Sequence, residues 1–470
     1  MSAETKSGEY SSNNAFIFNG NNGELNNNNK YNSNSVRPVT DFRDNCYTFE
    51  EFYLSLRIAL RVCYKNKRNT PNALRFRINE ADNLLRLARA EYYCEYVPGK
   101  SIIFLLKYPC LREAIAADFP DRVIQTWLVM RIEPLFNRCG SIPDEMYSCR
   151  VGKGNLAALM AVRDAIYRLS RGYTQDCTVA KFDIASFFMS IDKRKLYDAL
   201  VELVMENYHE PDKDMVLYLM RITTFNLPTE HHIRKTPICE WADLAPSKSA
   251  FNLDWFLGLA IGNLWSQTDA NFVNAPIVKF ILQFSDVKVV DYVDDFFLGS
   301  RDKDNLHRIV FHTRLKIAEH GLRMHPHKYH EQPYQHGIKM LGGVVKFGRM
   351  YISNRTVAKL ECKVHYYNTV YASGHFSKMR HLEKFVSIIN SYFGLMKHFA
   401  SYNIRKRISD QIMQYWDGYL YFSDDLLKAT IVRKYKDREI RKRKIRRKHR
   451  QITNILNTQY YGNNKQNQAA

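Results

Sequence analysis

Aspartates at the ends of apolar, β-rich segments are the residues of this sequence best suited to chemistry. Asp294 and Asp295 lie between the runs Val287–Val290 and Phe296–Leu298, so a hydrophobic hairpin would carry two charges at its tip. Adjacent carboxylates are costly there, because desolvation and mutual repulsion both act against the charged forms. A divalent metal ion would relieve that cost. The ordinary alternative is a solvated surface turn.

A third carboxylate, Asp183, ends another β-rich segment, Thr178–Ile184. If the two strands are neighbours, Asp183 and Asp294 converge on one point. Carboxylates and a backbone carbonyl, here that of Ile184, are the hard oxygen ligands that Mg²⁺ prefers. Two such ions, with Mn²⁺ as a possible substitute, would activate a 3′-hydroxyl and stabilise a leaving pyrophosphate. This chemistry needs no nucleophilic Ser, Cys or His, and the sequence offers no convincing triad.

The composition favours a polyanionic partner. The 470 residues carry a formal net charge of +21, and 45% of them are hydrophobic, enough for a large core. Such an excess of positive charge attracts nucleic acid or an anionic membrane surface. No apolar run approaches the length of a membrane span, and the N-terminal stretch is unlike a signal peptide. Nine scattered cysteines without zinc-ligand spacing predict free thiols in a reduced, intracellular protein.

The order of the expected elements indicates an α+β domain with an antiparallel sheet. Residues 1–40 are rich in Asn, Ser and Gly and predict a disordered tail. Apolar spacing predicts helices or strands over 47–90, Ser101–Leu106, Arg122–Phe136, Lys193–Asn207 and Gly262–Gln283. These alternate with the two β-rich segments, and mixing of this kind is typical of α+β folds. Residues 227–259 are expected to be irregular, and the chain after Gly343 mostly helical.

The last predicted segment is strongly basic. Residues 431–450 hold twelve Lys or Arg against two acids. Like charges repel along a helix, so such a segment needs an anionic partner. Binding of structured RNA through its phosphates is the favoured interpretation, and a solvated helix or a nuclear-localisation segment is the alternative.

The carboxylate pattern resembles that of the reverse transcriptase family, whose palm carries an aspartate ending one strand and a Tyr-x-Asp-Asp hairpin. The resemblance runs from about residue 108 to residue 397 and includes Asp183 and Tyr292–Asp295. It implies a right-hand polymerase with fingers, a palm of antiparallel sheet plus helices, and a helical thumb. The implied boundaries are residues 41–170 for the N-terminal helices and fingers, 171–345 for the palm, 346–430 for the thumb and 431–470 for a basic RNA-binding extension.

The resemblance also assigns roles to residues that contact substrate. Residues 147–157 resemble a finger motif, in which Arg150 and Lys153 would face the incoming triphosphate, although an ordinary basic loop is the alternative. Phe188 would lie under the sugar and exclude a 2′-hydroxyl, unless it is only a core residue. Lys328 resembles a lysine that protonates pyrophosphate. The implied nucleotide- or template-binding set is Arg150, Lys153, Phe188, Ile261, Gly262, Asn263, Gln267 and Lys328.

One subfamily fits best. Residues 258–267 read GLAIGNLWSQ, which resembles the I-G-N-x-x-S-Q pattern of reverse transcriptases from diversity-generating retroelements. Such enzymes copy a template RNA into cDNA with frequent errors opposite adenine, and the cDNA replaces a variable region in a target gene. Ile261 cannot form the hydrogen bond that a polar side chain could make near the nascent base pair, which predicts weaker selection between bases. The alternative is that Ile261 only packs under the site, and Trp265 departs from the subfamily pattern.

The implied partners are template RNA, a primer or cDNA strand, deoxynucleoside triphosphates and a small basic accessory protein. A cytoplasmic, prokaryotic or phage-encoded enzyme is expected. Three alternatives remain: a reverse transcriptase of a phage-defence or retron system, an RNA-templated RNA polymerase, and a catalytically inactive RNA-binding scaffold. The three carboxylates argue against the scaffold, which has no reason to retain them.

Overall fold

The chain forms two compact units. The computed structural model describes residues 14–18, 25–29, 47–67, 69–107, 110–373 and 379–432. Unit 1 comprises Met1–Ala158 and Gln175–Gln332, and unit 2 comprises Leu159–Thr174 and Pro333–Ala470. Within the Asn-rich segment, strands β1 (Asn14–Phe18) and β2 (Leu25–Asn29) pair antiparallel. The rest of the predicted tail, and the basic segment from residue 433 onward, lie outside the described residues.

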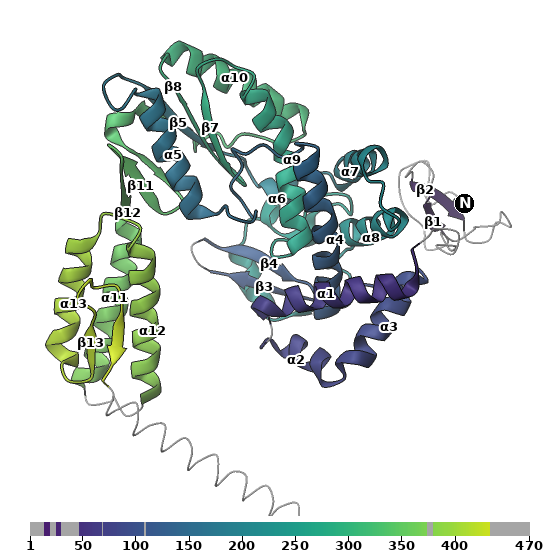
Figure 1. Cartoon of the computed structure of the whole chain (residues 1–470), viewed down its shortest axis with the longest axis horizontal. Coiled ribbons are helices and arrows are strands. Elements are labelled where there is room, and N and C mark those ends of the chain that lie inside the picture. Colours follow the sequence, from purple (N-terminus) through teal and green to yellow (C-terminus); the bar gives the residue numbers. More distant parts are fainter. Residues whose placement is uncertain are drawn as a thin grey trace, which may run out of the picture. The chain divides into compact units, whose positions relative to one another are not determined.

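Unit 1 begins with three helices where one periodic stretch was predicted (Figure 1): α1 (Phe49–Lys67), α2 (Pro71–Ile78) and α3 (Glu80–Tyr92). Thr48 and Glu51 form a reciprocal capping box that begins α1: the Thr48 backbone N–H donates to Glu51 Oε2 at 2.7 Å, and the Glu51 N–H donates to Thr48 Oγ1 at 3.3 Å. Helix α1 packs on α4 (Phe119–Arg138), where Trp127 Nε1 donates to Ser55 Oγ at 2.8 Å.

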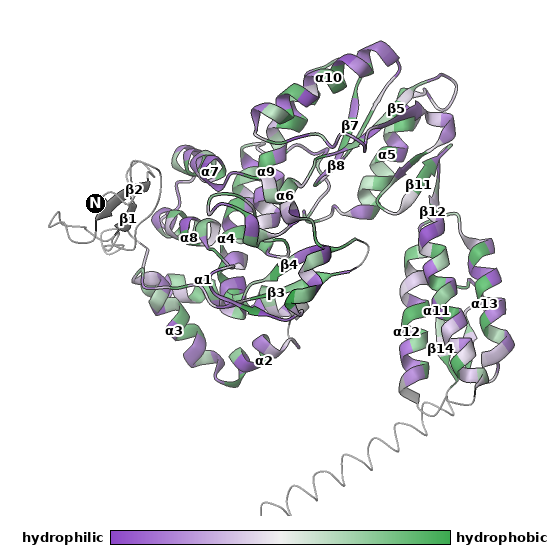
Figure 2. Cartoon of the chain, turned by 180° about the vertical axis from the view of Figure 1, so that it is seen from behind, coloured by the Kyte–Doolittle hydropathy of each residue, from purple (hydrophilic) through white to green (hydrophobic). Residues whose placement is uncertain are grey.

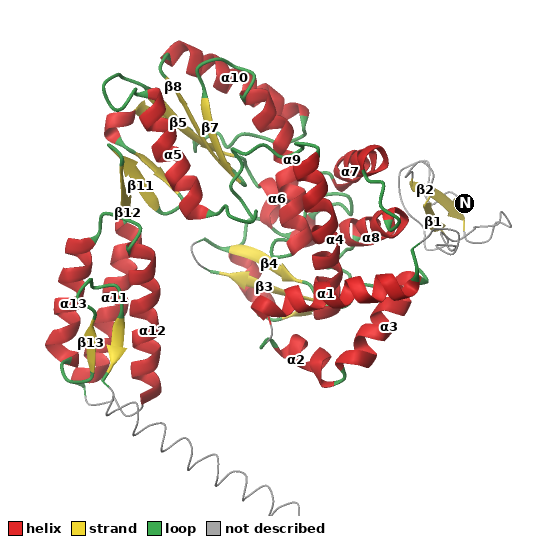
Figure 3. Ribbon diagram, in the orientation of Figure 1, coloured by secondary structure: helices red, strands yellow, loops and turns green. Residues whose placement is uncertain are grey.

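The central sheet of unit 1 contains the two β-rich segments predicted to carry carboxylates. Its strands are β5 (Thr178–Asp183), β7 (Lys288–Tyr292), β8 (Asp295–Ser300) and β9 (His330–Pro333), in the order β7-β8-β5-β9. Strand β8 pairs antiparallel with both β5 and β7. The rings of Phe182 and Phe296 stack across β5 and β8, with centroids 4.8 Å apart. With helices α9 and α10 beside it (Figure 3), this sheet confirms the predicted α+β class.

The remaining helices of unit 1 are α5 (Asn155–Leu169), which continues into unit 2, then α6 (Phe187–Ser190), α7 (Lys193–Asn207), α8 (Lys213–Phe225), α9 (Leu264–Ile281) and α10 (Lys303–Glu319). Helix α7 has the predicted bounds. Helix α9 starts two residues later than predicted, because Gly262 has φ of +115°, outside the helical region. Helices such as α10 carry hydrophobic and hydrophilic residues together (Figure 2), as expected where one face is buried.

A second sheet fixes the segment that was expected to be irregular. Strands β3 (Ser101–Leu106), β4 (Arg112–Ala116) and β6 (His232–Arg234) lie in the order β4-β3-β6, with β3 and β6 parallel. The fully buried Glu113 of β4 accepts hydrogen bonds from Trp241 Nε1 at 2.8 Å, Ser249 Oγ at 2.9 Å and the Ala250 N–H at 2.9 Å. One buried carboxylate therefore holds the 3₁₀ turns of residues 238–252 against the sheet.

Besides the C-terminal part of α5, unit 2 joins a small sheet to three further helices and a hairpin. Its elements are β10 (Ile338–Met340), β11 (Gly343–Lys346), β12 (Arg349–Ile352), α11 (Asn354–Ala372), α12 (Met379–Met396), α13 (Tyr402–Trp416), β13 (Leu420–Phe422) and β14 (Ala429–Ile431). Trp416 is fully buried, and its indole N–H donates to Asn368 Oδ1 at 2.8 Å. The mostly helical prediction for this part is confirmed. Among the described helices of the chain, none is long and apolar enough to cross a membrane.

Candidate active site

The sheet register brings the three predicted aspartates together. Asp183, the last residue of β5, is the direct partner of Asp295, the first residue of β8. Asp294 lies in the turn between β7 and β8, and its carbonyl oxygen accepts a hydrogen bond from the Ile184 N–H at 3.0 Å. The two β-rich segments are thus neighbours, as convergence of Asp183 and Asp294 requires.

The turn that carries Asp294 is held by residues that the sequence did not single out as functional. Val293 has φ of +62°, a strained conformation for a β-branched residue. Asn274 of α9 is fully buried, and its side-chain amide donates to the Val293 carbonyl and, at 3.4 Å, to Asp291 Oδ1. Sequence alone gave no sign of Asn274, since nothing in its spacing connects it to the hairpin.

Two lysines contact the carboxylates. Lys328 Nζ donates to Asp183 Oδ2, so the structure brings this predicted residue to the site. Desolvation alone would lower the pKa of Lys328, but its hydrogen bond to Asp183 and the nearby Asp charges raise it. Lys181, which was not predicted, pairs with Asp295 Oδ1 at 2.9 Å. It lies two residues before Asp183 and therefore on the same face of β5, which is the signal that could have revealed it.

The carboxylates of this cluster disfavour one another's charged forms. The pKa of Asp294 is raised to about 6, first by desolvation and then by the charges of Asp183 and Asp295. The repulsion by these two charges is the part of the shift that a bound cation would reverse. Asp291 is fully buried, and desolvation, followed by the charges of Asp294 and Asp295, raises its pKa well above the ordinary value.

The donor chemistry of the cluster fits a hard divalent cation, because all three side chains offer carboxylate oxygens. In the described part of the chain, no group of three or more His, Cys, Asp or Glu residues is already arranged around a metal position. Asp183 and Asp295 instead contact the cationic amines of Lys328 and Lys181, where a metal ion would supply the opposing charge.

The predicted template-side loop is fixed to β4 by its backbone. Ile261 accepts a hydrogen bond from the Ile115 N–H at 2.8 Å, and Asn263 Oδ1 accepts one from the Ala117 N–H at 3.1 Å. Gly262 is required between them, because a Cβ there would lie 3.0 Å from the Ile115 oxygen and its φ is +115°. The Asn263 side chain therefore stabilises this loop.

The predicted sugar-contacting residue is joined to the same loop. Phe188 is partly buried, and its carbonyl accepts a hydrogen bond from the Leu259 N–H at 2.8 Å. Phe187 beside it is buried in the core. Gln267 lies on the first turns of α9 and is partly buried.

The structure does not bring Arg150 and Lys153 to the aspartates by any described contact. Arg150 Nη1 donates to the carbonyls of Pro143 at 2.7 Å and Met146 at 3.1 Å, and Lys153 Nζ donates to the Asp144 carbonyl at 2.6 Å. Both cations therefore fasten their own loop in this conformation. That loop is joined to the site through its backbone, since the Tyr147 N–H donates to the Asp291 carbonyl at 2.9 Å.

A family model matches the part of the chain that contains this site. Residues 112–345, which include all three aspartates, match the family model described as reverse transcriptase (RNA-dependent DNA polymerase). No curated protein sequence matches the chain. Solved structures that are similar include telomerase from Candida albicans in complex with a fragment of telomeric RNA, at 12% identity and a TM-score of 0.42, over 68% of this chain and 63% of that one.

A second similar structure is apo telomerase from Candida tropicalis, truncated from its C-terminal domain. The identity is 12% and the TM-score 0.39, over 54% of this chain and 55% of that one. This chain therefore spans less than two thirds of either telomerase chain, and at such similarity neither adds to the functional argument. The family match and the paired carboxylates agree on the enzyme class that the sequence predicted: the chain belongs to the reverse transcriptase (RNA-dependent DNA polymerase) family.

Proposed function

We propose that this reverse transcriptase copies a template RNA into cDNA by two-metal nucleotidyl transfer, with Asp183, the Ile184 carbonyl, Asp294 and Asp295 as metal ligands. The observation that carries the proposal is the pairing of Asp183 with Asp295 beside the Asp294 turn. When bound, Mg²⁺ or Mn²⁺ would supply activation of the 3′-hydroxyl and stabilisation of the leaving pyrophosphate. The predicted fingers, palm and thumb, with a basic extension that binds template RNA, belong to the same proposal.

The chain's own residues would perform the other tasks. Lys328, protonated and beside Asp183, is positioned to donate a proton to the leaving pyrophosphate. Phe188, held by the Leu259 hydrogen bond, would exclude a ribose 2′-hydroxyl and so select deoxynucleotides. Arg150 and Lys153 would bind the triphosphate after exchanging their present carbonyl partners for phosphate oxygens, which are stronger acceptors for a cation.

We also propose that the enzyme serves a diversity-generating retroelement and miscopies template adenines. The GLAIGNLWSQ segment supports this, with Ile261, Gly262, Asn263 and Gln267 near the template and the nascent pair. A small basic accessory protein and a cytoplasmic location in a prokaryotic or phage-infected cell complete the proposal.

Replacing Ile261 with Gln tests the fidelity part. Gln can hydrogen-bond near the nascent base pair, so we expect errors opposite template adenine to fall by up to about tenfold, the value of one net hydrogen bond. Primer extension on an adenine-containing RNA template, followed by cDNA sequencing, measures the error rate. Ile261→Leu is the matched control and should copy as the wild type does. Accurate copying by the wild type would instead favour a phage-defence or retron reverse transcriptase.

Metal affinity should depend on pH through Asp294. Its pKa is raised to about 6, so the side chain is mostly neutral below that pH and protons then compete with the cation. Between pH 7 and pH 5 we expect the affinity for Mn²⁺ to fall by about tenfold, since each unit below the pKa costs one tenfold factor in a one-proton competition. Electron paramagnetic resonance of free Mn²⁺ measures this without catalysis. Equal affinities at pH 5 and pH 7 would contradict the assignment of Asp294 as a ligand.

A further inference from the structure

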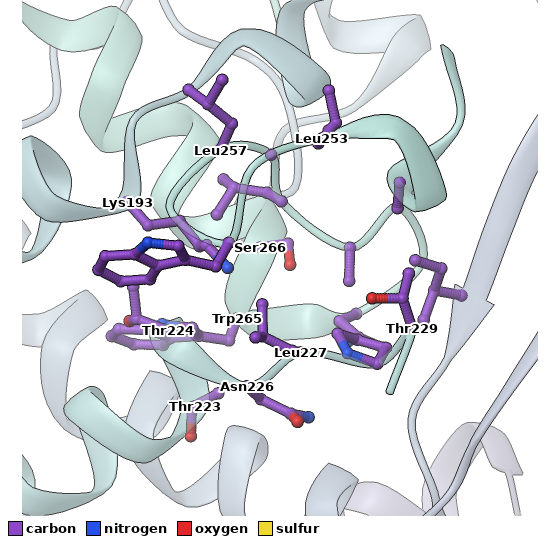
Figure 4. Close-up of a pocket in the computed structure, with 18 of the residues that line it drawn as sticks. Lys193, Thr223, Thr224, Asn226, Leu227, Thr229, Leu253, Leu257, Trp265 and Ser266 are labelled. Atoms are coloured by element: carbon purple, nitrogen blue, oxygen red, sulfur yellow. The ribbon is translucent and has the colours of Figure 1, made fainter. Parts of the chain in front are cut away.

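A pocket separate from the carboxylate cluster lies in unit 1. Its cavity volume is about 170 Å³, and it is lined by residues of α8, of the segment 250–260 and of the first turns of α9 (Figure 4). Asp183, Asp294, Asp295 and Phe188 do not line it. The pocket reaches the surface, because Glu230 and Asp254, which both line it, are exposed.

Asp269 of α9 supplies the first polar group of the pocket. The residue has no exposed surface, and neither carboxyl oxygen has a hydrogen-bond partner within the described part of the chain. Desolvation raises its pKa well above the ordinary value, and a buried carboxyl group without a partner favours the neutral form. A protonated carboxyl offers one donor and one acceptor side by side. Buried polar groups in proteins nearly always have hydrogen-bond partners. The Asp269 carboxyl group is therefore suited to hydrogen-bond with a ligand in the pocket.

Lys193, at the start of α7, supplies the second polar group. It is 3% exposed, and its side chain extends into the pocket with the terminal nitrogen foremost (Figure 4). Desolvation lowers its pKa to about 8, opposed by the charge of Glu230, so the amine is still mostly cationic at neutral pH. An ammonium group is a donor only, and it would be matched by an acceptor oxygen on a ligand.

The rest of the lining combines apolar and polar side chains. Met189, Leu253 and Leu259 contribute aliphatic surface, and the buried ring of Trp265 is held by its N–H bond to Thr224 Oγ1 at 3.0 Å. A concave pocket in which an aromatic ring and aliphatic side chains lie beside converging polar groups is typical of small-ligand sites. A cavity of about 150 Å³ is known to accommodate a single six-membered ring.

We propose that this pocket binds a pyrimidine nucleobase. The protonated Asp269 carboxyl would pair with the donor–acceptor edge at N3 and position 4 of the ring, and the Lys193 ammonium would donate to the O2 carbonyl. Adenine offers a donor–acceptor edge but no carbonyl oxygen for Lys193, and the two fused rings of a purine exceed the room that one ring needs. The base could come from a free nucleoside or from an unpaired pyrimidine of bound RNA.

Calorimetric titration of the full chain with cytidine, uridine and adenosine tests the proposal. The experiment contains no metal ion and no triphosphate, so it does not depend on the proposed polymerase activity. We expect both pyrimidine nucleosides to bind at least about tenfold more tightly than adenosine, since one charged hydrogen bond distinguishes them. Equal binding of all three, or binding of none together with a negative result in the RNA experiment below, overturns the proposal and leaves water as the occupant.

Matched variants connect the binding to Asp269. Asp269→Leu should weaken pyrimidine binding by about tenfold or more, because the donor–acceptor pair is lost. Asp269→Asn keeps one donor and one acceptor and should bind within about threefold of the wild type. Asp304→Leu, the same substitution at an exposed residue of α10 that does not line the pocket, should have no effect. Wild-type binding by Asp269→Leu would contradict the assigned contact, and thermal melting of each variant verifies that it is folded.

A second experiment distinguishes the source of the base. A purine RNA strand with one fluorescent cytosine analogue is bound to the full chain, again without metal. Quenching or a spectral shift that disappears in Asp269→Leu but persists in Asp304→Leu would assign the site to an unpaired base of RNA. Nucleoside binding with no such change would assign it to a free nucleoside.

Discussion

Asp294→Asn should reduce deoxynucleotide incorporation by about a thousandfold, since a metal ligand contributes several kcal/mol of transition-state stabilisation. The amide keeps the shape of the side chain but has no charge and offers only one weak acceptor oxygen to a cation. The turn itself should persist, because Val293 is held by Asn274 and Ile184 by the Asp294 backbone, and neither contact uses the carboxylate. Primer extension on an RNA template with Mg²⁺ measures the loss.

The matched control is Asp304→Asn, which makes the same change at an exposed residue in the first turn of α10. It should incorporate deoxynucleotides at the wild-type rate, and both variants should melt within a few degrees of the wild type. Similar activity of Asp294→Asn and wild type would refute the catalytic assignment. Loss of activity in both variants would point to a general effect of charge.

The three aspartates could be predicted because each signal is local. Asp183 and Asp295 end or begin apolar strands, and a carboxylate in that position has few structural explanations. Their convergence depended on one assumption, that the two strands are neighbours, and the β5–β8 register satisfies it residue for residue. The α+β class followed in the same way from mixed strand and helix patterns.

The residues that hold the site could not be predicted, since their partners are distant in sequence. Asn274 contacts Val293 only because α9 packs beside β7, and a buried amide on a helix has no periodicity of its own. Glu113 is similar: its three hydrogen bonds reach residues 241, 249 and 250, and a single glutamate in a strand predicts none of them. Contacts of this kind are decided by tertiary packing, which local patterns do not encode.

The cationic finger residues show a different limit. Arg150 and Lys153 were assigned to triphosphate from their motif, whereas the structure shows them bound to carbonyls of residues 143–146. A sequence gives the type of a donor, but it does not show which acceptor that donor binds when no phosphate is present. Their role in substrate binding therefore remains a prediction, and the contacts of their loop with Asp291 are a finding of the structure.

Asn274→Ala should lower kcat by about a hundredfold with little change in the KM for deoxynucleotide. The substitution removes the amide that holds the Val293 carbonyl and faces Asp291, so a turn with a positive φ loses its anchor. Asp294 and Asp295 would then sample several positions, and a displacement of about 1 Å of catalytic groups typically costs that factor. The proposed triphosphate contacts of Arg150 and Lys153 do not use this amide and should be unaffected. Steady-state primer extension separates the two constants.

A matched control is needed because any buried amide contributes to stability. Asn305 of α10 is also buried, and its side-chain N–H donates to the Ser285 carbonyl at 2.9 Å. Asn305→Ala should therefore cost a similar amount, about 1–3 kcal/mol in the free energy of unfolding, yet leave kcat near the wild-type value. Equal kcat in the two variants would show that Asn274 is only structural. A selective loss in Asn274→Ala, restored in part by Asn274→Gln, would show that α9 positions the metal ligands through this one amide.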